Sequence, residues 1–278
     1  KRTASDHRER VKTRLTVLVI ACAAILAPTT AHAVPAPVDL SGYYGQRLAW
    51  SPCDSYAQCA RLTVPLDYSD PSKGDLRLLV ERVKATAKTS KGALVVNPGG
   101  PGVAGAQYAL YGSYFLGQAA AHFDIVGFDP RGVGRSSPIR CLSNSLTDEF
   151  IGTDASPDTP AEMNAYISVS QRVAAACADK APDLYAHVGT YDTARDLDVL
   201  RAALNQETLT YVGFSYGTRL GAVYADLFPT RVGRLILDGA VDPSNDALEL
   251  VKGQAGGFDR AMSRFVADAV RSGSPLGQ

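Results

Sequence analysis

The five residues Gly213-Phe-Ser-Tyr-Gly217 carry the clearest chemical signal in the sequence. They follow a short apolar strand-like stretch, 208–212, and precede a segment with helical periodicity, so Ser215 stands at a strand-to-helix turn. A turn this sharp lifts the serine hydroxyl above the sheet edge, and the two glycines leave room where strand and helix approach. The motif therefore predicts Ser215 as a nucleophile. The alternative is a serine that serves only the turn.

A glycine-rich run, Asn97-Pro-Gly-Gly-Pro-Gly102, follows an earlier apolar stretch and could supply the second part of such a site. Glycines let main-chain amides approach a substrate carbonyl closely, and the start of a helix directs further amides toward an anion. We assign the N–H groups of Gly100 and Tyr216 as oxyanion donors. Each such donor contributes roughly 3–4 kcal/mol to transition-state stabilisation. Gly99 is the alternative to Gly100, and taken alone such a run is usually a plain turn.

The surrounding pattern indicates the elements that must position these residues. Short apolar strands alternate with amphipathic helices from residue 92 onward, which predicts an α/β fold with a mostly parallel sheet and helices on both faces. Stretches 61–68 and 76–83 are typical of antiparallel edge strands. We therefore expect the following organisation: a signal peptide at 1–33, an amino-terminal extension with edge strands at 34–91, a core at 92–243, and the start of a helical lid at 244–278.

These motifs resemble those of the secreted tripeptidyl aminopeptidases of actinobacteria, in the prolyl-iminopeptidase-like branch of the α/β-hydrolases. Besides the two glycine motifs, the resemblance includes Phe128-Asp-Pro-Arg-Gly-Val-Gly-Arg-Ser136 and Tyr224-Ala-Asp-Leu-Phe-Pro229, and it runs from about Trp50 to Pro243. It implies an α/β-hydrolase fold and a serine exopeptidase that removes short peptides from free amino ends. The expected partners are peptide or protein substrates. No cofactor and no metal are expected.

A catalytic base is missing from the predicted site. The turn at residues 213–217 is of the kind called a nucleophile elbow, and hydrolases that have it place an acid and then a histidine after the serine. Without a base, a serine hydroxyl is a poor nucleophile. The histidines are His7, His32, His122 and His187, and all precede Ser215. We interpret His122 and His187 as structural.

The simplest explanation is that the chain is the front part of a longer enzyme that lacks the triad acid, the histidine and the last strands. Asp238, at the end of the strand after the nucleophile helix, is a weaker candidate for the acid. Asp129 and Arg131 are interpreted as residues that fix the turn beside the elbow, with Arg131 paired to an acidic neighbour. Two other functions stay open: an esterase or lipase-like hydrolase, and a non-catalytic binding protein on the same fold.

The charge balance argues against one class of function. The 28 Lys and Arg residues equal the 28 Asp and Glu residues. After residue 33, however, 22 basic residues face 26 acidic ones. A mildly acidic body is not typical of a protein that binds nucleic acid through its charge.

The amino end predicts export. A basic head (1–14), an apolar run (15–27) and the small-residue triplet Ala31-His-Ala33 follow the order of a secretory signal peptide. The apolar run is shorter than the roughly 20 residues needed to span a bilayer. The predicted location is extracellular, with no integral membrane segment after signal removal. The alternative is a lipid anchor on Cys22.

Four cysteines remain after the predicted cleavage, and an oxidising compartment favours disulfides between them. Four cysteines allow three pairings. Nearness in sequence favours Cys53–Cys59 together with Cys141–Cys177, and free buried thiols are the alternative.

Overall fold

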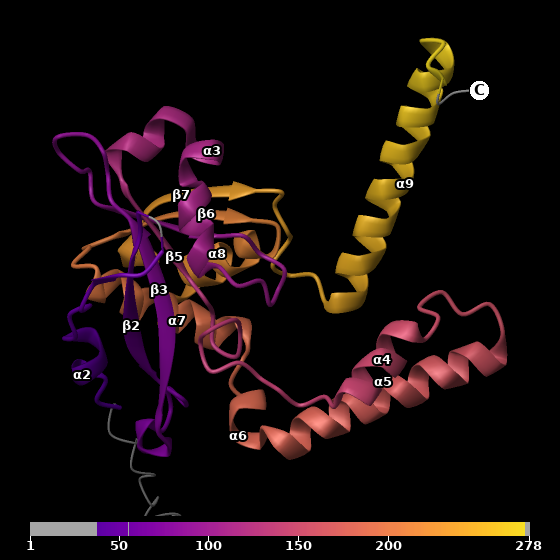
Figure 1. The fold of residues 1–278 in the computed structure, drawn as a ribbon, viewed down its shortest axis with the longest axis horizontal. Helices are drawn as coiled ribbons and strands as arrows, with labels where there is room; N and C mark the ends of the chain where they lie inside the picture. Colours follow the sequence, from indigo (N-terminus) through magenta and orange to yellow (C-terminus); the bar gives the residue numbers. More distant parts are fainter. Residues whose placement is uncertain (1–37, 55, 276–278) are drawn as a thin grey trace, which may run out of the picture. The chain divides into compact units, whose positions relative to one another are not determined.

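A single mixed sheet organises the computed structural model, which describes residues 38–54 and 56–275. The predicted signal peptide and Cys22 lie outside the described residues. The strands are β1 Ser51–Pro52, β2 Gln58–Pro65, β3 Asp75–Val83, β4 Ala93–Asn97, β5 Asp124–Phe128, β6 Leu209–Phe214 and β7 Val232–Asp238. Their order in the sheet is β1-β2-β3-β5-β4-β6-β7 (Figure 1).

The sheet has a parallel part and an antiparallel part. Strands β5, β4, β6 and β7 run parallel to one another. Strands β1, β2 and β3 pair in antiparallel fashion, and β3 joins β5 in the same way. All five residues of β4 are buried, as expected for a central strand covered on both faces. The predicted mostly parallel sheet with antiparallel edge strands is confirmed.

Helices cover both faces of the sheet, as the sequence predicted. The α-helices are α2 Ser41–Tyr44, α3 Gly112–Leu116, α4 Asn144–Gly152, α5 Pro160–Lys180, α6 Pro182–Tyr185, α7 Thr190–Ala203, α8 Tyr216–Leu227 and α9 Ala247–Arg271. The 3-10 helices are η1 Pro71–Lys73, η2 Ala106–Tyr111, η3 Gly117–His122 and η4 Pro229–Arg231. The larger core cluster packs α7 and α8 against one face, and the smaller one packs η2, α3 and η3 against the other (Figure 1).

Local sequence signals explain several helix ends. Helix α5 begins at a capping box, in which Thr159 and Glu162 satisfy each other's main-chain amides, with Pro160 in the first turn. Helix α8 stops at Leu227, two residues before Pro229, because proline cannot continue the hydrogen-bond ladder. Neighbouring residues in the sequence therefore explain where α5 begins and where α8 ends.

Helix α9 occupies the segment predicted as the start of a lid. Of its described residues only Ala269 is buried. Its large exposed apolar side chains are Leu248, Val251, Phe258, Met262, Phe265, Val266 and Val270. The lid role and the domain boundaries stay predictions. In the part of the chain that the structure describes, none of the helices combines the length and the apolar character needed to cross a bilayer.

The four cysteines pair as predicted. Cys53 and Cys59 form one disulfide with 5.6 Å between their Cα atoms, and Cys141 and Cys177 form the other with 4.7 Å. The first closes the loop between β1 and β2. The second ties the segment before α4 to the end of α5.

Candidate active site

Ser215 occupies a strained turn between β6 and α8. Its backbone angles are φ 53° and ψ −122°, a region that residues with a side chain rarely adopt. The residue is exposed, whereas Val212 and Gly213 before it and Gly217 after it are buried. The turn thus presents the serine to solvent above a closed core, as the motif predicted.

The glycines on either side are required by close contacts. A Cβ atom on Gly213 would lie 2.4 Å from the Gly217 carbonyl oxygen, and one on Gly217 would lie 2.8 Å from the Asn97 carbonyl oxygen. Neither contact is compatible with a larger residue unless the backbone shifts. The spacing of the motif is therefore set by how tightly β6, α8 and the end of β4 pack.

Hydrogen bonds from outside the motif hold the strained turn. The Ser215 amide donates to the Asp238 carbonyl oxygen at 2.9 Å. The Thr218 hydroxyl donates to the Ser215 carbonyl oxygen at 2.6 Å and accepts from the Val241 amide at 2.8 Å. The elbow is thereby linked to the end of β7. From the sequence, Asp238 was a weaker candidate for the triad acid and otherwise a residue that orders the following loop; its main-chain bond to Ser215 was not predicted.

A buried tyrosine supports the same turn from beneath. The Tyr211 hydroxyl donates to the Gly217 carbonyl oxygen at 2.8 Å. Burial raises the pKa of Tyr211, so the hydroxyl keeps the proton that it donates. Tyr211 was predicted only as a strand residue, because nothing in its local sequence marks the contact.

The glycine-rich run after β4 lies directly against the elbow. A Cβ atom on Gly99 would approach the Phe214 carbonyl oxygen to 2.4 Å, the Tyr216 amide nitrogen to 3.0 Å and the Ser215 Cβ to 3.2 Å. The Gly99 amide itself donates to Asn97 Oδ1 at 2.9 Å. The predicted neighbourhood of the two glycine motifs is therefore present in the structure.

The Gly99 amide is engaged in a hydrogen bond, whereas within the described part of the chain the two amides assigned as oxyanion donors are not. Among the described residues, neither the Gly100 amide nor the Tyr216 amide has a hydrogen-bond acceptor. The Gly99 amide is occupied, which favours Gly100 over Gly99 as the donor from this run. The Tyr216 side chain is anchored separately, with its hydroxyl 2.7 Å from Thr190 Oγ1 at the start of α7.

Asp129 and Arg131 stabilise the loop after β5. The Asp129 carboxylate accepts hydrogen bonds from the amides of Ala106 and Arg135 at 2.9 and 2.8 Å. The fully buried Arg131 guanidinium pairs with Asp196 of α7 at 2.5 Å. The predicted acidic partner of Arg131 is therefore Asp196, which the sequence alone did not identify. Asp196 also accepts from the Tyr68 hydroxyl at 2.8 Å.

Neither described histidine is bonded to the elbow. His187 lies 3.7 Å from Asp67 and 4.0 Å from Asp192, and its carbonyl oxygen accepts from Arg131. The His122 carbonyl oxygen accepts from the Lys91 amide at 2.7 Å. Within residues 38–54 and 56–275, no hydrogen bond or ion pair links a histidine to Ser215.

One group of potential metal ligands occurs in the described residues: Cys53, Cys59 and Glu81. Both sulfur atoms are joined in the disulfide, so they cannot act as thiolate ligands. This group does not fit a metal site.

The structure thus combines a strained serine between strand and helix, two glycine motifs in contact and a mostly parallel sheet. The family model described as the alpha/beta hydrolase fold matches residues 92–274. The chain belongs to the α/β-hydrolase family. The resemblance stated from the motifs is confirmed, because the family model covers the elbow and the curated relatives include peptidases.

Three curated relatives are similar over most of this chain. Serine protease Hip1 of Mycobacterium tuberculosis is 41% identical over 247 residues, which are 84% of this chain and 47% of that protein. Tripeptidyl aminopeptidase of Streptomyces lividans is 41% identical over 196 residues, 69% of this chain and 36% of that protein. Carboxylesterase B of Mycobacterium tuberculosis is 37% identical over 243 residues, 82% of this chain and 46% of that protein. The chain spans about half the length of the curated relatives it matches most extensively.

Solved structures are more distant. A proline-iminopeptidase-related protein from Thermus thermophilus is 21% identical, with a TM-score of 0.35, over 69% of this chain and 44% of that one.

Proposed function

We propose that this chain forms the nucleophile half of a secreted serine aminopeptidase that releases short peptides from free amino ends. The observation that carries the proposal is the exposed Ser215 on its strained turn, with Gly99 packed against it. Two relatives, one named a serine protease and the other a tripeptidyl aminopeptidase, support a peptide substrate.

The proposed reaction proceeds through an acyl-enzyme. Ser215 Oγ loses its proton to a base and bonds to the substrate carbonyl carbon, and the carbonyl oxygen becomes an anion stabilised by the Gly100 and Tyr216 amides. The carbon–nitrogen bond then breaks and the leaving amine takes the proton. Water hydrolyses the ester and restores the Ser215 hydroxyl.

We propose that the base and its acid are supplied by sequence beyond Gln278 in a longer protein. Three observations support this: no described histidine forms a hydrogen bond or ion pair with Ser215, the chain covers 47% of Hip1, and β7 is a terminal strand with Ile236 57% exposed. An unpaired strand edge with exposed apolar side chains is typical of a sheet that continues. The complete reading frame tests this point, and an encoded acid and histidine after Gln278 are expected.

Secretion is part of the proposal. Two disulfides in the structure support an oxidising compartment. The amino-terminal residue of the mature protein, determined by mass spectrometry, distinguishes cleavage before Val34 from a lipid anchor on Cys22.

An esterase is the second candidate, because one relative at 37% identity is named carboxylesterase B. The full-length protein should be assayed on peptide nitroanilides with free and with blocked amino ends, and on nitrophenyl esters. An aminopeptidase cleaves the free-ended peptides and loses activity when the amino end is blocked. Activity on esters alone would favour the esterase.

A further inference from the structure

A cleft of about 440 Å³ lies over β2 and β3, outside the candidate active site. Leu62 and Leu78 point into the core that α7 and α8 cover. Arg61 and Arg77 are their neighbours along β2 and β3, and because successive side chains of a strand point to opposite faces, the cleft opens on the other face of the sheet. The disulfide Cys53–Cys59 forms part of one wall. A covalent bond therefore holds this wall in place.

Arginines from separate segments line this cleft. Arg61 lies on β2 and Arg77 on β3, in diagonal positions because Thr63 is paired with Arg77 and Arg61 with Leu79. Arg135 comes from the loop after β5, and its carbonyl oxygen accepts from Arg61 Nη1 at 2.6 Å. Arg47 lines the rim.

Positive charge exceeds negative charge around this cleft, which among the described residues is lined by four arginines and by no carboxylate. The acidic groups beside it are Glu81 and Asp54, which act on each other electrostatically. The Arg77 side chain has no hydrogen bond or ion pair within residues 38–54 and 56–275. The bond described for Arg61 is to a neutral carbonyl group. Arg135 faces the buried Glu81 at 3.5 Å, so one of the four arginines has an acidic partner, although burial raises the pKa of that carboxyl group. Like charges held together in this way repel one another unless an anion joins them.

We propose that this cleft binds an oxyanion of the phosphate class carrying two or more negative charges. Planar guanidinium groups match phosphate oxygens with paired hydrogen bonds. Several arginines around one cleft exceed the single charge of one carboxylate, which is why phosphate chemistry fits better. The volume falls within the range of about 300–1,000 Å³ that small ligands occupy.

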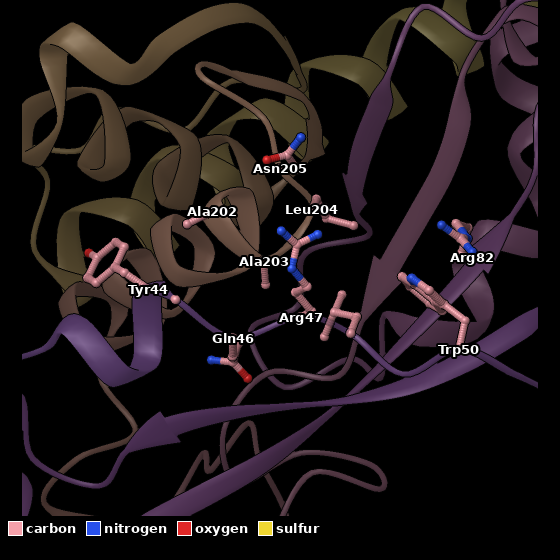
Figure 2. A pocket seen from close by; sticks show the side chains of 11 residues that line it. Tyr44, Gln46, Arg47, Trp50, Arg82, Ala202, Ala203, Leu204 and Asn205 are labelled. Atoms are coloured by element: carbon pink, nitrogen blue, oxygen red, sulfur yellow. The ribbon is translucent and has the colours of Figure 1, made fainter.

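A second hollow of about 350 Å³ borders Arg47, and it is less suited to an anion because the charge of its other arginine, Arg82, is already engaged. Figure 2 shows Arg47, Trp50 and Arg82 around it. The Arg82 guanidinium stacks 4.0 Å from the centre of the Trp50 ring, donates to Gln58 at 2.7 Å and lies 3.9 Å from Asp124. Because its charge is already engaged, we place the anion over β2 and β3.

Calorimetric titration of the full-length protein with sodium pyrophosphate at low ionic strength tests the proposal. The wild type is expected to show saturable binding at one site, weakening as salt is added. The double variant R61Q/R77Q should bind at least about tenfold more weakly. R260Q/R264Q, which removes two exposed arginines of α9, is the control matched in charge and should bind like the wild type.

Three results would overturn the proposal: no pyrophosphate binding by the wild type, undiminished binding by R61Q/R77Q, or an equal loss in the α9 control. If R61Q/R77Q fails to fold, R77Q replaces it, because Arg77 makes no described polar contact. Inorganic phosphate and phosphatidylglycerol vesicles are titrated in parallel to distinguish a free anion from a lipid headgroup. Vesicle binding without pyrophosphate binding would assign the surface to a membrane and contradict a small-anion site.

Discussion

Ser215 is exposed and has a strained backbone. Single-residue changes can separate the chemical role of its hydroxyl from the effect of its side chain on the stability of the turn. A side chain in this conformation costs about 1–3 kcal/mol, which the Asp238 carbonyl and Thr218 hydroxyl help to offset. Removal of the hydroxyl is therefore expected to change turnover, and removal of the Cβ atom is expected to change stability.

In the full-length protein, Ser215→Ala should lower turnover by at least roughly 10³-fold and abolish labelling by a fluorophosphonate probe. Ser215→Gly should be equally inactive but more stable than Ser215→Ala by about 1 kcal/mol, because glycine tolerates φ 53°. Urea melts and labelled-peptide mapping measure both effects. A label on another serine would contradict the assignment.

Asp67 gives a prediction on pH at the same scale. Hydrogen bonds from the Lys73 ammonium and from Ser69 hold the pKa of this carboxyl well below its usual range. A lowered folded-state pKa stabilises the fold above the unfolded-state pKa of about 4, and this contribution is lost as the pH falls through the folded-state value. Lys73 is half exposed, so the effect is modest.

Asp67→Asn is therefore expected to be less stable than the wild type by about 1 kcal/mol at pH 7. The difference should shrink as the pH falls below about 4. Denaturant melts at pH 7 and pH 3 measure it. A difference that does not change with pH would show that Asp67 acts through its shape rather than its charge.

At the scale of elements, the two disulfides differ in the length of chain they close. The bond from Cys141 to Cys177 spans 36 residues, whereas Cys53 and Cys59 are 6 apart. On the chain-entropy estimate the longer loop contributes about 4 kcal/mol and the shorter about 2 kcal/mol. The longer one should therefore matter more to the stability of the fold.

Non-reducing peptide mapping of the secreted protein should recover both bonds. The double variant C141A/C177A should lose about 4 kcal/mol of unfolding free energy and C53A/C59A about 2 kcal/mol. Denaturant melts compare them. Four alkylatable thiols in the native protein, or the opposite order of stability, would refute the prediction.

At the scale of the whole molecule, the open edge at β7 limits the stability of residues 34–278 when they are expressed alone. Burying a large apolar side chain contributes roughly 1.5–3 kcal/mol, and a domain is stable by only about 5–15 kcal/mol. The exposed Ile236 on β7 and the exposed apolar side chains of α9 are therefore costly for an isolated fold.

We expect residues 34–278, expressed alone, to aggregate or to be molten and to show little or no turnover. The full-length protein should be cooperative and monomeric. Thermal melts, binding of a hydrophobic dye and size-exclusion chromatography decide between these outcomes. A sharp two-state melt without dye binding would show that the sheet is self-sufficient as it stands.

The sequence by itself determined the features that depend on neighbouring residues. The elbow motif, the strands from 92 onward, helices α7 and α8 and the four cysteines were all identified from local spacing or periodicity. Such signals are strong because the strand and helix periods are set by backbone geometry within a few residues. The segment η2–α3–η3 was not predicted, because its apolar residues follow neither the strand nor the helix period clearly.

Only the tertiary structure decided which distant residues meet. The strand order brings Gly99 to Ser215, Asp238 to the Ser215 amide and Asp196 to Arg131, contacts between segments that are far apart in sequence. Long-range pairing depends on the order and register of the sheet and on the packing of helices over it, and no short window of sequence contains that information. The residue types that do the chemistry were therefore visible in the chain, whereas the contacts that hold them in place were not.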